Sequence, residues 1–239
     1  MMTIEPAKLR LRSGDQVLDL GCGEGRHSIG IALEAINQGN INVVGVDLSV
    51  DDLLSAKNRS EAFEDATLSC NWACADGLKL PFADNTFQKI ICSEVLEHIP
   101  DYKGMLNEIE RVLKPNGLLA VSVPRRWPEK ICWWLSEAYH KVEGGHIRIF
   151  RARELREEIS AFGFQHYDRH WAHALHAPFW WLKCVFWNSQ DSNPLVRAYH
   201  RLLVWDLMDK PWLTQTIERL LNPLMGKSVV MYFERNGET

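Results

Sequence analysis

Three glycines at every second position, Gly21, Gly23 and Gly25, stand directly after the apolar run Val17–Leu20. Glycine has no Cβ and accepts positive φ angles, so a turn built from it lets a ligand lie against bare backbone. The pattern differs by one residue from the dinucleotide-binding sequence G-x-G-x-x-G, in which a pyrophosphate sits at a helix N-terminus. Alone, the glycine turn indicates either a ligand site or a tight reversal between a strand and a helix.

Two further carboxylates stand where apolar runs end. Asp47 closes the β-branched run Ile41–Val46, and Asp76 follows the run Leu68–Ala75. A carboxylate at the end of a second strand can accept hydrogen bonds from both ribose hydroxyls of a nucleoside. Asp76 is suited to an exocyclic amine and a ring nitrogen, and Asp19, before the glycine turn, to an ammonium group. Three carboxylates at successive strand ends predict a ligand with cationic groups rather than a pyrophosphate.

An open parallel sheet would bring these residues to one edge. Apolar runs and helix-compatible stretches alternate up to residue 124, which is typical of βαβ units. Open α/β sheets bind ligands outside the carboxyl ends of their strands. We therefore expect an α/β fold with strands over residues 17–20, 41–46, 68–75, 87–92 and 118–123.

Five motifs, in chain order, resemble the class I S-adenosylmethionine-dependent methyltransferases, in particular the group that includes the ubiquinone and menaquinone enzymes. They are Val17–His27, Val43–Ser49, Asp76–Phe87, Ile91–Pro100 and Val112–Leu118. The resemblance implies S-adenosyl-L-methionine as cofactor and a doubly wound, Rossmann-like sheet of seven strands, mostly parallel. It also implies that the final strand, expected over Lys227–Glu234, inserts antiparallel between the fifth and sixth strands.

The resemblance assigns five residues to the methionine end of the cofactor. Gly21, Gly23 and Gly25 would flank the methionine part. Asp19 would lie near its amino group, and Ser93 would approach it through the main chain.

Four residues are likewise assigned to the nucleoside end. Asp47 would hold the ribose, with Leu48 against the adenine. Asp76 would bind the adenine amine, and Gly77 would offer backbone beside the ring.

Two histidines are candidate catalytic residues. His98 lies five residues after Ser93, and His146 stands in a Gly-Gly-His loop before a helix. Either could accept a proton from the acceptor or orient it, because the unperturbed pKa of histidine is near 6.5; either could instead be a packing or surface residue. His27 is expected to pack beside the cofactor, and Arg148 to bind a substrate carboxylate or phosphate or to be solvated. No spacing of ligand residues predicts a metal site.

Tryptophan is concentrated in the second half of the chain, where nine of the ten lie beyond residue 126. The segments 131–142 and 178–187 are rich in it, and they predict either the core of a helical cap or a greasy pocket or lipid-facing surface. In the first segment a helical stripe is expected from Ile131, Trp134, Leu135, Ala138 and Val142. The expected organisation is a cofactor-binding core (1–124), a substrate-side helix and loop (125–150), a returning helix and strand (151–171), a helical Trp-rich insertion (172–226) and a final core strand (227–239).

These features predict an S-adenosylmethionine-dependent methyltransferase for a small hydrophobic acceptor, such as a quinone precursor, a prenyl lipid or a polyketide. One alternative is a regulatory or interaction module that binds the cofactor without turnover. Another is a protein or nucleic-acid methyltransferase, although no Asn-Pro-Pro-Tyr-like motif follows the fourth strand. The net charge of -4 argues against a nucleic-acid partner. The oligomeric state stays open.

Cysteine usage and the absence of targeting patterns predict a cytoplasmic protein. The six cysteines form no Cys-x-x-Cys pair, which favours reduced thiols. The N-terminal residues show no basic region followed by an apolar stretch, so we expect no signal peptide. No run approaches the roughly 20 apolar residues that span a bilayer, which leaves peripheral contact with a membrane as the open question.

Overall fold

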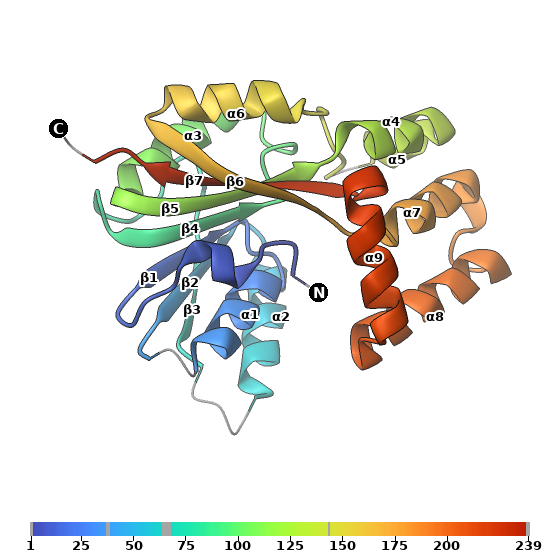
Figure 1. Ribbon diagram of the computed structural model, residues 1–239, viewed down its shortest axis with the longest axis horizontal. Helices are drawn as coiled ribbons and strands as arrows, with labels where there is room; N and C mark the ends of the chain where they lie inside the picture. Colours follow the sequence, from blue (N-terminus) through green and yellow to red (C-terminus); the bar gives the residue numbers. More distant parts are fainter. Residues whose placement is uncertain (1, 37–38, 64–67, 143, 238–239) are drawn as a thin grey trace.

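The computed structural model of the chain describes residues 2–36, 39–63, 68–142 and 144–237 (Figure 1). Its centre is a seven-stranded sheet in the order β3-β2-β1-β4-β5-β7-β6. Strand β7 pairs antiparallel with β5 and β6, and the pairs among β1 to β5 are parallel, which confirms the predicted sheet. The strands are β1 (Gln16–Leu20), β2 (Asn42–Asp47), β3 (Cys70–Cys74), β4 (Phe87–Ser93), β5 (Leu113–Pro124), β6 (Phe164–Ala172) and β7 (Ser228–Arg235).

Helices cover both faces of this sheet and extend past one end of it. Figure 1 shows α3 and α6 above the sheet, α1 and α2 below it, and α7, α8 and α9 grouped beyond the end of β6. The helices are α1 (Arg26–Ala35), α2 (Val50–Glu61), α3 (Tyr102–Val112), α4 (Arg126–Leu135), α5 (Glu137–Lys141), α6 (Ala152–Ala161), α7 (His176–Val185), α8 (Pro194–Asp209) and α9 (Trp212–Met225), with 3-10 turns η1 (Pro6–Leu9) and η2 (Trp187–Ser189).

The alternation of strand residues builds two cores, one on each face. Leu18 and Leu20 pack with α3 and α6, whereas Val17 packs with α1 and the N-terminal segment. Side chains of a strand point to opposite faces in turn, so Asp19 lies on the face of α1. Each fully buried leucine contributes up to about 3 kcal/mol of transfer free energy. Burial on both faces therefore holds the end of β1 where the glycine turn begins.

The predicted stripe over residues 131–142 is wrong, because the helix is interrupted at Ser136. This residue has an extended backbone (φ -147°), and its hydroxyl accepts a hydrogen bond from the amide of Tyr139 as the N-cap of α5. Trp134, expected on the stripe, is 83% exposed. Glu129, Cys132 and Tyr139 are buried instead. Serine competes for backbone hydrogen bonds and so favours a cap over a helix interior.

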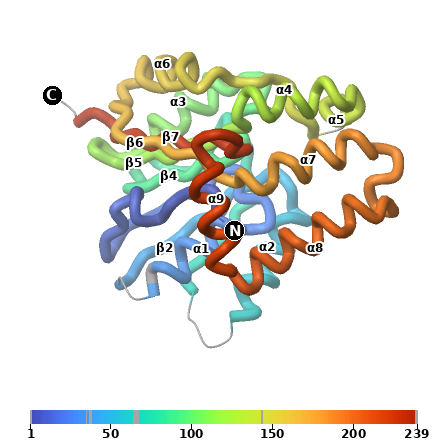
Figure 2. The backbone as a smooth tube through the Cα atoms, turned by 45° about the vertical axis from the view of Figure 1, so that its right-hand side comes forward, coloured from blue at the N-terminus to red at the C-terminus, as the bar shows by residue number. Residues whose placement is uncertain are grey.

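Helices α7, α8 and α9 enter the structure between β6 and β7, and we call them the cap. The first described residues lie against its base (Figure 2), where the Thr3 hydroxyl is 3.0 Å from Nε2 of His173. In the described ranges no helix combines the length and apolar character needed to cross a bilayer.

Candidate functional site

A cavity of about 1050 Å³ separates the glycine turn from the cap. One wall is formed by Gly21 to Glu24, the start of α1, and Ser93 and Glu94 after β4. The opposite wall comes from α7, α8 and the residues just before α7. Its apolar members are Phe179, Trp180, Leu203, Val204 and Leu207, and its histidines are His173, His176 and His200.

The three glycines of the turn all have left-handed backbones but differ in what surrounds them. Their φ angles are 70°, 50° and 77° for Gly21, Gly23 and Gly25. A Cβ on Gly21 would stand 2.4 Å from Cγ2 of Val95, and one on Gly25 would stand 2.5 Å from the Trp72 ring. A Cβ on Gly23 would meet no described atom within 4 Å. Gly23 is thus the position where bare backbone faces the cavity, as a cofactor cradle requires.

Asp19 is buried under the glycine turn and ties β1 to α1. Its Oδ2 accepts hydrogen bonds from the amide (2.9 Å) and the hydroxyl (2.6 Å) of Ser28. Burial raises the pKa of Asp19 to about 6, against the lowering effect of these bonds. The contacts give Asp19 a structural part at the turn; its contact with a ligand ammonium stays a prediction.

Asp47 and Asp76 follow neighbouring strands and lie at one edge of the sheet. The amide of Gly23 donates a hydrogen bond to Oδ2 of Asp47 (2.8 Å), and the amide of Ser49 donates one to Oδ1 (2.9 Å). The Ala75 amide donates to the Asp47 carbonyl (3.1 Å), which brings the two strand ends together. Asp76 is exposed.

The two neighbours of these carboxylates differ in exposure. Leu48 is 65% exposed, so its side chain is free to pack against a flat ring such as adenine. Gly77 is buried, and a Cβ there would stand 2.4 Å from Cε of Met105. Both placements are compatible with the predicted adenine site, which stays a prediction.

Ser93 lines the cavity, but its hydroxyl is engaged elsewhere. The Oγ atoms of Ser93 and Ser122 lie 2.8 Å apart, and Ser122 donates a hydrogen bond to Oε1 of Glu94 (2.9 Å). Because the Ser93 hydroxyl is engaged with Ser122, the prediction that Ser93 approaches the cofactor through its main chain is compatible with the structure. Glu94 has a left-handed backbone (φ 57°) and lines the cavity, and sequence reasoning missed it.

The two catalytic candidates, His98 and His146, come together with ring centroids 4.9 Å apart. Neither is among the described residues that line the cavity. Nδ1 of His98 lies 3.3 Å from the Gly145 carbonyl, and Nδ1 of His146 lies 2.6 Å from Oε1 of Glu129. Burial lowers the pKa of His98, and the charge of His146 lowers it further. Whether either histidine takes part in catalysis stays a prediction.

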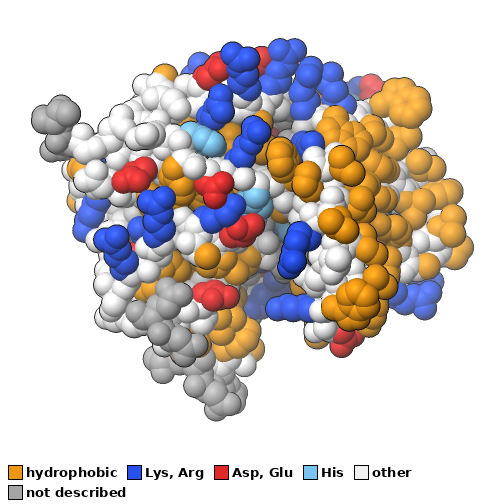
Figure 3. Space-filling model, in the orientation of Figure 1, with side chains coloured by type: hydrophobic (Ala, Val, Ile, Leu, Met, Phe, Trp, Pro, Cys, Tyr) orange, Lys and Arg blue, Asp and Glu red, His pale blue; other side chains and the backbone are white. Residues whose placement is uncertain are grey.

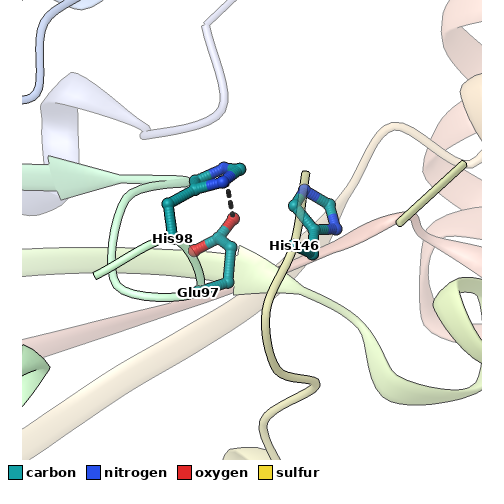
Figure 4. Close-up of side chains that lie close together, drawn as sticks. All are labelled: Glu97, His98 and His146. Atoms are coloured by element: carbon teal, nitrogen blue, oxygen red, sulfur yellow. Dashed lines mark ion pairs between the residues drawn. The ribbon is translucent and has the colours of Figure 1, made fainter. Parts of the chain in front are cut away.

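Two buried carboxylates beside these histidines were missed by sequence reasoning. Oε1 of Glu97 lies 4.0 Å from Nε2 of His98 (Figure 4). Burial raises the pKa of Glu97 well above its ordinary value. For Glu129 burial acts in the same direction, but hydrogen bonds from His146 and Trp133, together with the charges of His146 and Lys227, outweigh it and lower the pKa. The available signal for Glu97 was its place next to His98, directly after Val95 and Leu96, which is weak.

His27, His173 and His176 line the cavity from both walls and are held by burial. Nε2 of His27 accepts a hydrogen bond from the Thr3 amide (3.1 Å). Burial lowers the pKa of His27 to about 3 and that of His176 to about 4. The buried ring of His27 and its hydrogen bond to Thr3 agree with the prediction that His27 is a packing residue. His173 and His176, which sequence reasoning did not select, lie with ring centroids 5.2 Å apart.

Arg148 holds the turn that carries His98. Its guanidinium donates hydrogen bonds to the carbonyls of Leu96 (3.2 Å), Ile99 and Pro100 (2.9 Å). It also lies 4.7 Å from the Tyr102 ring centroid. The guanidinium is thus committed to backbone acceptors, which disfavours the expectation that it binds a substrate carboxylate or phosphate.

Comparison with known proteins agrees with this geometry. Residues 11–176 match the family model described as "Methyltransferase domain". The chain is 36% identical over 115 residues to a demethylmenaquinone methyltransferase of Corynebacterium urealyticum, covering 48% of this chain and 44% of that protein. It is 31% identical over 153 residues to a sterol 24-C-methyltransferase of Aspergillus fumigatus, covering 64% and 37%. The chain thus spans less than half the length of these two curated relatives.

A solved structure described as a SAM-dependent methyltransferase of Methanosarcina mazei superposes with a TM-score of 0.61. The match covers 99% of this chain and 100% of that one. Because the identity is only 16%, the match shows the fold alone. The family match rests on the sequence of more than half the chain. The chain belongs to the class I S-adenosylmethionine-dependent methyltransferase family.

Proposed function

We propose that the protein transfers a methyl group from S-adenosyl-L-methionine to a small hydrophobic acceptor, such as a quinone-like molecule, a prenyl lipid or a polyketide. One observation carries the proposal. The cavity has the bare backbone of Gly23 on one wall and apolar side chains of α7 and α8 on the other. It therefore offers a cradle for a polar cofactor and a greasy compartment for an acceptor side by side.

The strand ends would hold the two halves of the cofactor. Asp47 and Asp76, with Leu48 and Gly77, would bind the nucleoside, because β2 and β3 are joined where the two carboxylates stand. The glycine turn, Asp19 and Ser93 would hold the methionine end. The bound cofactor supplies a methyl group already activated on a sulfonium, so the protein's own residues chiefly provide alignment.

His98 and His146 would act on the acceptor rather than on the cofactor. The turn that carries His98 begins at the cavity wall, since Ser93 and Glu94 line it. We propose that the two histidines orient the acceptor or accept its proton. Proton transfer to a positioned side chain typically contributes about 10²–10⁴-fold to a rate.

The outer face of the cap supports acceptor delivery from a membrane surface. In α9 the buried side chains are Thr214 and Glu218, whereas Trp212, Leu220 and Leu224 are exposed by 78%, 68% and 67%. This amphipathic pattern is the reverse of that of an ordinary surface helix, whose apolar stripe faces the core. The apolar face of α9 therefore needs a partner outside the described chain.

Helix α8 continues the same surface, and Figure 3 shows hydrophobic side chains gathered on this side of the molecule. Met208 and Leu195 are 74% and 60% exposed. Val204 and Leu207 are both more than two-fifths exposed and also line the cavity, so apolar surface runs from outside to inside. Basic side chains flank it at Arg197, Arg201, Lys210 and Arg219, as in helices that lie on anionic lipid.

For the segment 178–187 the sequence left a cap core, a greasy pocket and a lipid-facing surface open, and its tryptophans turn inward. Trp180 lines the cavity, and Nε1 of Trp181 donates a hydrogen bond to the Pro128 carbonyl (3.1 Å). The membrane proposal therefore rests on α8 and α9 alone.

The function is tested with methyl-labelled S-adenosylmethionine and a lipid extract of the host, followed by separation of the lipids that gain label. The variant Gly23→Ala should lose binding of the cofactor in calorimetry and lose label transfer. Gly163→Ala is a matched control, because Gly163 also has positive φ (83°) and a Cβ there also meets no described atom within 4 Å. Wild-type binding without transfer to any lipid or polar acceptor would favour a module without turnover; absence of binding would contradict the proposal.

A further inference from the structure

Three side chains beside the cavity converge as metal ligands do. Glu97, His98 and His146 each offer one ligand atom, and these atoms lie within 4.8 Å of one another. Figure 4 shows Glu97 and His98 on one turn, facing His146 on another segment. Two imidazoles and one carboxylate are donors that suit divalent transition metals.

The Glu97 carboxylate lacks the partners that a buried carboxylate needs. Its exposure is 0%, and neither oxygen has a hydrogen-bond partner among the residues that the structure describes. Buried polar groups in native proteins are nearly always satisfied, and an unpaired buried charge is costly. A cation between Glu97 and the two histidines would satisfy it.

Each histidine is held through one ring nitrogen, which leaves the other for a ligand. Nδ1 of His146 is bonded to Glu129, which also accepts hydrogen bonds from Trp133 (3.1 Å) and Tyr139 (3.3 Å). Nδ1 of His98 lies 3.3 Å from the Gly145 carbonyl. Metal-binding histidines almost always donate their second N–H to a carboxylate or a carbonyl in this way.

The charge around the cluster is negative. The carboxylates of Glu94 and Glu129 act electrostatically on Glu97, and Lys227 is the cation that opposes them. Three carboxylates against one ammonium favour uptake of a divalent cation, since the histidines are neutral when they act as ligands.

We propose that Glu97, His98 and His146 bind one divalent transition-metal ion, such as zinc or manganese, and that Glu129 positions His146 for it. Donors about 2 Å from a tetrahedral zinc ion stand roughly 3.4 Å apart, so the side chains need to close by about 1 Å. The His98 side chain keeps 32% of its surface exposed, which leaves an open face for a further ligand.

The place of the ion bears on how the acceptor would be activated, a role that rests on the proposed function. Glu94, three positions before Glu97, lines the cavity. An ion beside it is suited to coordinate an acceptor hydroxyl and lower its pKa, with the proton released to water. The two histidines would then be ligands rather than proton acceptors.

The test is direct binding of zinc, and of cobalt as a coloured substitute, to protein stripped of metal with a chelator. Calorimetry should give one site per chain in the wild type, and cobalt should give a visible spectrum showing nitrogen and oxygen ligands. Glu97→Gln and His146→Gln should weaken zinc binding at least tenfold, and Glu129→Gln should weaken it about tenfold with unchanged stoichiometry. His166→Gln, whose ring packs on Phe233 of the sheet, is the control and should bind zinc as the wild type does.

Melting temperatures keep the test independent of folding and of activity. Without metal, Glu97→Gln should melt at or above the wild-type temperature, because it removes an unpaired buried carboxylate. Zinc should raise the melting temperature of the wild type but not of this variant. Wild-type protein that binds no zinc or manganese, or binding that Glu97→Gln and His146→Gln leave unchanged, would overturn the metal site and leave the methyl-transfer proposal standing.

Discussion

The carboxylate of Asp47 accepts a 2.8 Å hydrogen bond from the amide of Gly23. The end of β2 thereby holds the glycine turn that follows β1 in its left-handed conformation. The residue predicted to bind a ribose and the residue predicted to face the methionine end are joined directly. This contact predicts that cofactor binding and the shape of the turn are coupled through one side chain.

Replacing Asp47 by alanine should weaken cofactor binding at least tenfold and lower the free energy of unfolding by about 1–2 kcal/mol, because the Gly23 amide loses its acceptor. Calorimetry with S-adenosylmethionine and urea unfolding measure the two effects. Asp51→Ala is a suitable control, since Asp51 is exposed in the first turn of α2. Equal affinities in the wild type and Asp47→Ala would remove Asp47 from the binding site.

Replacing Gly21 by alanine should destabilise the fold by about 2–3 kcal/mol, since the new Cβ would stand 2.4 Å from Cγ2 of Val95 in a packed core. Gly14→Ala separates this clash from backbone strain, because Gly14 has φ 87° and a Cβ there meets no described atom within 4 Å. Urea midpoints provide the measurement. A Gly21 variant no less stable than the Gly14 variant would show that Val95 yields without cost.

Acid should destabilise the protein below about pH 6.5 through its buried neutral histidines. Burial lowers the pKa of His27 to about 3 and that of His176 to about 4 in the folded chain, against about 6.5 in the unfolded chain. Between these values the unfolded state binds more protons, so stability falls as the pH falls, by up to about 1.4 kcal/mol per pH unit for each histidine.

Urea unfolding from pH 7 to pH 4.5 checks this slope, and His176→Gln should flatten it. Asp19 acts in the opposite sense, because burial raises its folded pKa to about 6 and its protonation favours the native state as the pH falls below that value. Asp19→Asn should therefore steepen the loss of stability in acid. A slope that His176→Gln leaves unchanged would contradict the burial of this histidine.

Liposome flotation should show binding to anionic vesicles that depends on α8 and α9. Trp212→Glu combined with Leu220→Glu should abolish flotation. Both side chains are exposed on α9, and the substitutions would put negative charges where apolar side chains are proposed to enter the membrane. Leu54→Glu on α2, at a side chain that is 53% exposed, should leave flotation unchanged. Self-association that the first pair of substitutions disrupts, in the absence of flotation, would assign the face to a second copy of the chain instead.

The sheet was predictable because strand periodicity and turn residues carry local information. The strand expected over 118–123 starts earlier in the structure, at Leu113. Leu113 pairs with Phe87 of β4, and the register then shifts so that Leu118 pairs with Lys89. Between these two pairs Asn116 takes a left-handed conformation (φ 59°). The run Pro115-Asn116-Gly117 is typical of a turn that ends a helix before a new strand. The sequence therefore did not predict that the strand would begin before this run.

The metal candidates show where sequence reasoning ends. His98 and His146 were selected one at a time, but their meeting depends on how the segment after α5 folds back onto the turn after β4. No local pattern marks Glu97 or Glu129 as a partner of these histidines. Nor does the sequence of α9 show that Glu218 would be buried and Trp212 exposed. Such facts depend on tertiary contacts, which local patterns do not encode.

The pairing of Ala172 with Ser228 has a consequence for how the protein could diversify. The cap leaves β6 and returns to β7 at two positions that face each other in the sheet, so its two ends are fixed side by side. We therefore expect that helices α7 to α9 can be exchanged without altering the ladder beneath them. Under the proposed function a new acceptor would require new helices here, while the strand ends proposed to bind the methyl donor stay as they are.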